Sequence, residues 1–160
     1  IENYLKLQEW LEAEGYAFVS DTDTEVIAHL VHFYSNSLDL FEAVRKSMTV
    51  LEGSYAIAVM SKKNPDLLIA ARKDSPLIVG LGENEFFTSS DATAFVAHTR
   101  NVVFVDDREL VKLTPEKVEF YDMEGQLLEK QVSTIDWVVC LKRVGLRDWE
   151  KLLSDAMPKR

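Results

Sequence analysis

The chain has 160 residues, of which 47% are hydrophobic, and its formal net charge is −9. This length suits one domain with a buried core, and no apolar run is long enough to cross a bilayer. The acidic excess argues against nucleic acid and anionic membranes as partners, because both select clustered Lys and Arg. The single cysteine, Cys140, excludes an internal disulfide and fits a reducing compartment such as the cytoplasm.

The first part of the chain is predicted to be helical. Apolar residues at three- and four-residue spacing predict a helix from Tyr4 to Leu11, with Asn3 as its cap and Gly15 beyond its end. The apolar run at residues 16–19 predicts a short buried strand.

A capping box is the sharpest local signal. Thr22 is followed three residues later by Glu25, immediately before an apolar-periodic run, which predicts a helix start. The second helix is expected over residues 26–34, and a third over residues 40–51 with Gly53 as its C-terminal cap.

From residue 54 the apolar period becomes that of strands. Residues 54–60 and 67–72 flank the stretch 62–66, whose composition is typical of a hairpin turn. Further strands are expected at residues 77–80, 85–89, 102–105, 109–113, 118–121 and 127–132, with a short helical stretch at 90–98. Helices followed by adjacent strands indicate an α+β fold with mainly antiparallel sheets.

The final segment, residues 138–160, differs in composition from the rest. It is basic and carries apolar residues that suit an amphipathic helix. Its basic residues are Lys142, Arg143, Arg147, Lys151, Lys159 and Arg160. We expect a divergent tail or the start of an interdomain linker there.

The histidines are weak candidates for a metal site. His29 and His32 lie three residues apart on one predicted helix, but no further Cys or His completes a ligand set. His98 is equally isolated. We expect solvated histidines and no metal.

Other polar stretches are interpreted as scaffold. Arg72 and Asp74, near Ser75-Pro76, suggest an anion site when they are taken in isolation. Ser89-Ser90-Asp91 is typical of a helix cap. The stretch Gly80-Leu81-Gly82 is expected to be a turn, because no strand–loop–helix unit of the dinucleotide type surrounds it.

Two long blocks of sequence resemble one family. Residues 1–30 carry Ile1-Glu2-Asn3-Tyr4 and Thr22-Asp23-Thr24-Glu25-Val26-Ile27-Ala28-His29-Leu30. Residues 53–91 carry Gly53-Ser54-Tyr55-Ala56, then Ala70-Ala71-Arg72-Lys73-Asp74-Ser75-Pro76-Leu77, then Ser89-Ser90-Asp91. With Ile135-Asp136-Trp137, this pattern is similar to the glutaminase domain of the glutamine–fructose-6-phosphate aminotransferases, also called glucosamine-6-phosphate synthases.

The resemblance implies a fold and a reaction. The fold is an N-terminal-nucleophile (Ntn) hydrolase-like αββα sandwich of two mainly antiparallel sheets, of which residues 1–137 form a partial type 2 glutamine amidotransferase domain, incomplete at its N-terminus. An N-terminal cysteine would release ammonia from glutamine, without a cofactor, for isomerase domains that hold fructose 6-phosphate and form glucosamine 6-phosphate. The parent protein is expected to be a cytoplasmic homo-oligomer.

Only one substrate residue carries over from that family. Asp23 matches the family's aspartate that binds the α-ammonium group of glutamine, although a carboxylate in a first helical turn is also favoured by the helix dipole. Thr22 and Glu25 are interpreted as the cap that fixes Asp23. The resemblance also implies that the stretch containing Arg72 and Asp74 is mainly scaffold. The nucleophile has no counterpart, because Cys140 lies in the tail with chain on its nitrogen, and the isolated chain is expected to be inactive.

Two alternatives stay open. One is the glutaminase domain of a related enzyme of the phosphoribosylpyrophosphate amidotransferase type, although that enzyme typically has Arg-Pro-Leu where Arg72 precedes Ser75-Pro76-Leu77 here. The other is a non-catalytic truncated module. A domain lacking its first part would leave sheet edges and apolar faces uncovered, so the isolated chain is expected to aggregate or to need a partner.

Overall fold

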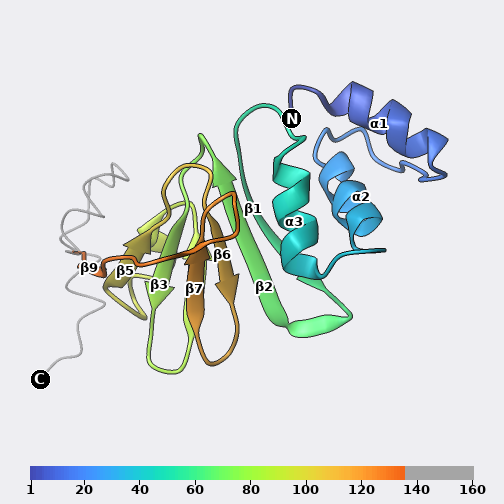
Figure 1. The fold of residues 1–160 in the computed structure, drawn as a ribbon. Helices are drawn as coiled ribbons and strands as arrows, with labels where there is room; N and C mark the ends of the chain where they lie inside the picture. The colour runs from blue at the N-terminus through green and yellow to red at the C-terminus, as the bar shows by residue number, and fades with distance from the viewer. Residues whose placement is uncertain (136–160) are drawn as a thin grey trace, which may run out of the picture.

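A computed structural model describes residues 1–135. Three helices cover one face of a five-stranded sheet, sheet A, whose other face packs on a four-stranded sheet, sheet B (Figure 1). Both sheets are antiparallel throughout. The predicted α+β class and the stacking of two antiparallel sheets are confirmed. Within the described part of the chain, the second outer layer contains only the short 3-10 helix η1 (Ala92–Ala94).

The helices are α1 (Tyr4–Ala13), α2 (Glu25–Tyr34) and α3 (Leu40–Met48). Gly15 follows α1 with φ +90, as its predicted place beyond the helix end requires. The C-cap of α3 is Thr49, so Gly53 does not end that helix, although its φ of +97 fits a turn before the next strand. Asp39 caps α3, since its side chain accepts the Glu42 N–H at 2.9 Å.

Of two predictions near α1, one is confirmed in position and the other is wrong. Asn3 is the N-cap residue of α1, but its side chain makes no capping bond, because it bonds to the α3–β1 connection: it donates to the Val50 carbonyl and accepts the Glu52 N–H. Residues 16–19 form no strand, and Val19 is 92% exposed. This segment packs Tyr16 and Phe18 against α2 instead of entering a sheet.

Sheet A has the strand order β1-β2-β6-β7-β8. Its strands are β1 (Tyr55–Ser61), β2 (Asn64–Lys73), β6 (Leu110–Leu113), β7 (Val118–Tyr121) and β8 (Leu127–Leu128). The predicted hairpin joins β1 to β2, but β2 begins at Asn64, so the turn is shorter than residues 62–66. β1 lies at the edge of the sheet.

Sheet B has the order β4-β3-β5-β9. Its strands are β3 (Ile78–Leu81), β4 (Phe86–Ser89), β5 (Asn101–Phe104) and β9 (Ser133–Thr134). The strand predicted at residues 127–132 is wrong in extent, because the chain leaves sheet A after Leu128 and joins sheet B at Ser133. The segment between these two strands therefore connects the two sheets.

The core is divided by the alternation of side chains along the strands. Ile69 and Ala71 of β2 face the helices, together with Leu30 of α2 and Val44 of α3. Ala70, between them, faces sheet B and joins an inter-sheet cluster. A third cluster covers the far face of sheet B; it contains Ala92, Phe95 and Val102.

The turn predicted at residues 80–82 is wrong for Gly80, which belongs to a strand. Gly80 lies in β3, and a Cβ there would stand 2.7 Å from the ring of Phe95. The missing side chain lets this ring pack directly on the strand. Only Gly82 belongs to the following turn, where its N–H donates to the Glu85 carbonyl at 2.9 Å.

An ionic cluster holds the segment that connects the sheets. The Lys130 Nζ lies 2.6 Å from the Asp106 carboxylate and 2.8 Å from that of Glu109. The side chains of Lys130 and Glu109 are 12% and 11% exposed, whereas Asp106 is open to solvent. The cluster therefore ties the β8–β9 connection to the β5–β6 loop.

Candidate functional site

Asp23 lies in the turn that leads into α2. Its carboxylate contacts the α-amino group of Ile1, and its side chain is 41% exposed. The contact joins the start of the chain to the start of α2. The carboxylate of Asp23 is thus accessible to solvent beside the start of α2.

Glu25 fixes the segment before Asp23 but does so differently from a capping box. One carboxylate oxygen accepts the Val19 N–H at 2.9 Å, and the other accepts the Ser20 N–H at 2.8 Å and the Ser20 hydroxyl. The helix N-cap is Thr24, with no side-chain capping bond, and Thr22 contributes its carbonyl to the Glu25 N–H. The predicted Thr22–Glu25 capping box is wrong, because the Glu25 carboxylate accepts hydrogen bonds from Val19 and Ser20 and not from the Thr22 N–H.

The electrostatics of this turn favour an ionised Glu25. The hydrogen bond from the Ser20 hydroxyl, followed by that from the Val19 amide, lowers the pKa of Glu25 to about 2. Its side chain is only 12% exposed. Glu25 is therefore a fixed anion that shapes the loop before Asp23.

The histidines of α2 are partners of aromatic rings. His29 packs edge-on against Phe18, with ring centroids 4.5 Å apart, and its Nε2 lies 3.3 Å from Glu25. His29 is only 23% exposed, so the expected solvated position is wrong for it. His32 is exposed and its Nδ1 forms a hydrogen bond of 2.9 Å with the Tyr16 hydroxyl. Among residues 1–135 no cluster of three His, Cys, Asp or Glu could hold a metal.

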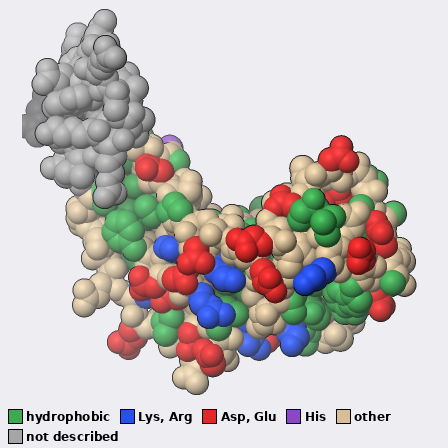
Figure 2. All heavy atoms as spheres, turned by 90° about the horizontal axis from the view of Figure 1, so that it is seen from above, with side chains coloured by type: hydrophobic (Ala, Val, Ile, Leu, Met, Phe, Trp, Pro, Cys, Tyr) green, Lys and Arg blue, Asp and Glu red, His purple; other side chains and the backbone are tan. Residues whose placement is uncertain are grey.

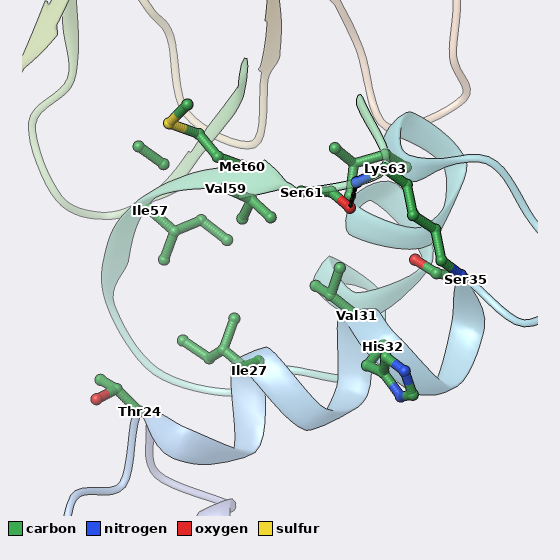
Figure 3. Close-up of a pocket in the computed structure, with 13 residues that line it drawn as sticks. Thr24, Ile27, Val31, His32, Ser35, Ile57, Val59, Met60, Ser61 and Lys63 are labelled. Carbon is green, nitrogen blue, oxygen red and sulfur yellow. Dashed lines mark hydrogen bonds between the residues drawn. The ribbon is translucent and has the colours of Figure 1, made fainter. Parts of the chain in front are cut away.

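An apolar groove of about 510 Å³ runs between α2 and β1 (Figure 3). Ile27 and Val31 point into it from α2, and Ile57 and Val59 point into it from β1. Thr24 stands at one end, next to Asp23, and Ser35 and Lys63 stand at the other. Asp23 itself does not line the groove.

Sequence reasoning did not predict this groove. The signal that could have revealed it is the apolar run Ala56-Ile57-Ala58-Val59-Met60, which suits a strand covered on both faces. In the structure that strand is at a sheet edge and Met60 is 66% exposed.

Arg72 and Asp74 are structural, as predicted. Arg72 Nη1 donates to the Val105 carbonyl at 3.0 Å, and the Asp74 N–H donates to Asp107 at 2.6 Å. Both residues therefore hold the β5–β6 loop against β2. At the other predicted cap, the Asp91 side chain accepts the Thr93 N–H at 2.8 Å and begins η1, which confirms the interpretation of residues 89–91.

The position of the only cysteine in the sequence bears on whether the described residues contain a nucleophile. The sole cysteine, Cys140, lies outside the described residues. Residues 1–135 therefore contain no thiol. On the face in Figure 2, acidic side chains lie at both ends and basic ones gather near the middle.

The helices of this part of the chain are too short and too polar to traverse a lipid bilayer.

A family described as "Glutamine amidotransferase domain" matches residues 1–97. The chain belongs to this glutamine amidotransferase family. The match contains α1 to α3 and the first strands of both sheets, and it includes Asp23.

Curated relatives of this amidotransferase chain share one name, glutamine–fructose-6-phosphate aminotransferase [isomerizing]. The protein of Clostridium tetani is 48% identical and aligns with 100% of this chain and 28% of its own length. That of Caldanaerobacter subterraneus is 49% identical over 87% of this chain, and that of Methanosarcina mazei is 50% identical over 86%. The chain spans about a quarter of the length of these relatives.

A solved structure supports the amidotransferase fold. Glutamine phosphoribosylpyrophosphate amidotransferase from B. subtilis, complexed with ADP and GMP, superposes with a TM-score of 0.66 and 26% identity over 78% of this chain and 28% of that one. The likeness agrees with the predicted Ntn-type sandwich. Its lower identity places this enzyme further away than the aminotransferases.

Proposed function

We propose that the chain is the ammonia-donating, glutamine-hydrolysing part of a glutamine–fructose-6-phosphate aminotransferase that makes glucosamine 6-phosphate. The support is the family match together with relatives of that name at 48–50% identity. Fructose 6-phosphate is taken up by other domains of the protein, which is a homo-oligomer in the cytoplasm. In this proposal residues 1–137 form part of a larger type 2 amidotransferase domain, and residues 138–160 are a tail or linker.

Asp23 is proposed to bind the α-ammonium group of glutamine. The support for this role is that Asp23 lies within the region that matches the glutamine amidotransferase family and that its carboxylate stands in the turn that leads into α2. The side chain is partly exposed, so a soluble amino acid can reach it. Holding one charged end of glutamine helps to place its distant amide carbon for attack.

The 160-residue chain by itself is proposed to lack glutaminase activity. Its only thiol, Cys140, has no free α-amine to act as a base. Ammonia release from glutamine by the purified chain, above that of a Cys140→Ala variant, would refute this.

A chimera tests the proposal as a whole. This chain replaces the aligned region of the Clostridium tetani relative, and glucosamine 6-phosphate formation from glutamine and fructose 6-phosphate is measured. We expect activity in the chimera. We expect Asp23→Ala to raise KM for glutamine by about 10- to 100-fold, because a hydrogen bond to a charged group contributes about 1.5–3 kcal/mol.

The matched control is Asp21→Ala, which removes an exposed carboxylate two residues earlier in the same loop. It is expected to leave KM within about twofold, as surface substitutions change free energies little. An Asp23→Ala chimera with unchanged KM for glutamine would exclude the ligand role, and an inactive parent chimera would count against the assigned reaction.

The phosphoribosylpyrophosphate amidotransferase type stays a weaker alternative. The structural likeness supports a shared fold, while the higher identity to the sugar-phosphate enzymes favours the first proposal. The coding sequence that flanks this chain distinguishes the two, because it encodes either sugar-isomerase or phosphoribosyltransferase domains.

A further inference from the structure

His29 has surroundings that the other two histidines of the chain lack. Its side chain is 23% exposed, whereas His32 is exposed and the side chain of His98 is 57% exposed. His29 lies on α2 one turn after Glu25, and it does not line the groove between α2 and β1. Neither the proposed glutamine contact nor the groove therefore accounts for a largely buried imidazole at this position.

Two aromatic rings hold the imidazole of His29. Phe18 packs edge-on against it with ring centroids 4.5 Å apart, and Tyr16 does the same at 5.2 Å. Both rings come from the segment that connects α1 to α2. Because these contacts already restrict the rotamers of His29, its hydrogen bond to Glu25 costs little additional side-chain entropy.

The bond between His29 and Glu25 has a defined direction. His29 Nε2 lies 3.3 Å from Glu25 Oε1. An ionised carboxylate only accepts hydrogen bonds, so Nε2 carries the hydrogen and donates it. Oε1 is the same oxygen that accepts the Val19 N–H. His29 therefore holds the Glu25 carboxylate in the orientation in which it binds the chain before Asp23.

The other carboxylate oxygen of Glu25 continues this path towards Asp23. Oε2 accepts both the N–H and the hydroxyl of Ser20. Since the Ser20 hydroxyl donates its only hydrogen to Glu25, its oxygen accepts from the Thr22 hydroxyl, 2.9 Å away. The Thr22 N–H also donates to this oxygen, at 3.4 Å. Thr22 immediately precedes Asp23, so a continuous chain of hydrogen bonds joins the imidazole to the neighbour of the proposed ligand.

Packing contributes little to the position of this segment. Val19 is 92% exposed, and Ser20 and Thr22 are exposed as well. The backbone before Asp23 therefore depends on the hydrogen bonds that converge on Glu25. Misplacing a substrate-binding group by about 1 Å can cost about 100-fold in rate, so the support of this segment matters for the use of glutamine.

We propose that His29 is a positioning residue for glutamine binding, which acts by orienting the Glu25 carboxylate. Through the hydroxyls of Ser20 and Thr22, that carboxylate sets the position of Asp23. The inference rests on the proposed binding of the glutamine α-ammonium group by Asp23. His29 itself does not contact the substrate.

Two substitutions of His29 test the inference in the chimera with the Clostridium tetani relative. His29→Phe keeps an aromatic ring but removes the N–H donor, whereas His29→Gln keeps an N–H donor at a similar reach. We expect His29→Phe to raise KM for glutamine by about 3- to 10-fold with kcat within about twofold, and His29→Gln to keep KM within about twofold of wild type. A residue that only stabilised the fold would lower the amount of active protein, and hence the apparent kcat, without changing KM.

His98→Phe is the matched control. His98 also packs against a phenylalanine ring, that of Phe87 at 5.2 Å, and its Nδ1 lies 3.9 Å from the Glu85 carboxylate. It lies with Phe87 on the far face of sheet B and not beside α2. The control is therefore expected to leave KM for glutamine within about twofold.

A double-mutant cycle shows whether the effect of His29 passes through Asp23. Once Asp23→Ala has removed the carboxylate, adding His29→Phe is expected to raise KM by less than about a further twofold. A full additional increase in the Asp23→Ala background would overturn the inference. An unchanged KM in the single variant His29→Phe would do the same.

Hydrogen exchange supplies a readout that does not depend on catalysis. The Val19 and Ser20 amides of the chimera both bond to Glu25. We expect them to exchange at least about 5-fold faster in His29→Phe and at close to the wild-type rate in His29→Gln. Unchanged exchange of both amides in His29→Phe would exclude the ordering of this segment by His29.

Failure of this inference is distinguishable from failure of the proposed function. If Asp23→Ala raises KM for glutamine but His29→Phe does not, the ligand role of Asp23 stands and the positioning role of His29 is excluded. If Asp23→Ala leaves KM unchanged, the ligand role fails and the positioning role fails with it.

Discussion

Replacing Lys130 by methionine is expected to destabilise the fold by about 3 kcal/mol. Methionine keeps the length of the side chain but removes the ammonium group, which lies 2.8 Å from Glu109 and 2.6 Å from Asp106. The nearly buried Glu109 carboxylate then keeps the hydrogen bond from the Asp106 N–H but has no cation beside it. Breaking a buried ion pair in this way costs about 3–5 kcal/mol, and the lower end applies because Asp106 stays in contact with water.

A second ion pair in the same protein supplies the control. Lys117 Nζ also lies 2.8 Å from a carboxylate, that of Glu119, but its side chain is 60% exposed. Lys117→Met makes the same change of charge and is expected to cost about 0.5 kcal/mol or less. Because the N···O distance is the same in both ion pairs, comparing the two variants isolates the effect of burial on the free energy of unfolding.

Urea unfolding followed by tryptophan fluorescence measures both costs, with all variants at one chain concentration because association shifts apparent stability. Adding Glu109→Gln to Lys130→Met is expected to recover part of the loss, since it removes the stranded charge. The reasoning is wrong if Lys130→Met and Lys117→Met cost the same, or if the double variant is no more stable than Lys130→Met.

Three further perturbations follow from single contacts. Burial raises the pKa of Tyr55 to about 12, and its buried hydroxyl has no partner among residues 1–135, so Tyr55→Phe is expected to be at least as stable as wild type. The wild type should also lose stability as the pH rises from about 10 to 12, because the phenol of Tyr55 ionises there only in the unfolded chain. Urea unfolding across that range should show a smaller loss for the variant, in which only other groups such as Tyr121 still contribute. Gly80→Ala places a Cβ 2.7 Å from the Phe95 ring and is expected to lower the free energy of unfolding in urea by about 1–3 kcal/mol. The loss should be smaller in a Phe95→Leu background, and an equal loss in both backgrounds would exclude this clash. Glu25, with its pKa near 2, is expected to protect the Ser20 amide from hydrogen exchange above pH 4.5 and to lose that effect as the pH falls towards 2, whereas Glu25→Gln should show weak protection at every pH.

The sequence was informative where the signal is periodic and local. Apolar spacing located α1, α2 and α3 to within a few residues, and strand-like alternation found the strands up to residue 121. Both are direct consequences of which side chains must face the core. The Ala92 turn was also predictable, because Asp91 caps its own neighbours.

The wrong predictions concern side chains whose bonding or packing partner is far away in the sequence, or for which several donors lie within reach. Asn3 bonds to residues almost fifty positions away, which no local pattern encodes. Glu25 had several backbone donors within reach and took those of Val19 and Ser20 instead of that of Thr22. Gly80 was read as a turn residue because its actual role depends on the distant ring of Phe95.

The candidate site was only partly predictable. The resemblance selected Asp23, and the structure shows its partly exposed carboxylate in the turn that leads into α2. The groove beside β1 could not be derived from the sequence, because it depends on how far α2 extends past the sheet edge, which is a property of helix packing.

The path of the chain between its sheets constrains how the molecule folds. After β2 the chain builds three strands of sheet B before it returns as β6, so Leu68 pairs with Leu113 across the whole of that excursion. The central strand pair of sheet A therefore joins residues that are far apart in the sequence, and such pairings form slowly during folding. Neither sheet is built from one continuous stretch of chain, and after a proteolytic cut between β3 and β5 only non-covalent contacts would hold β2 and β6 in register.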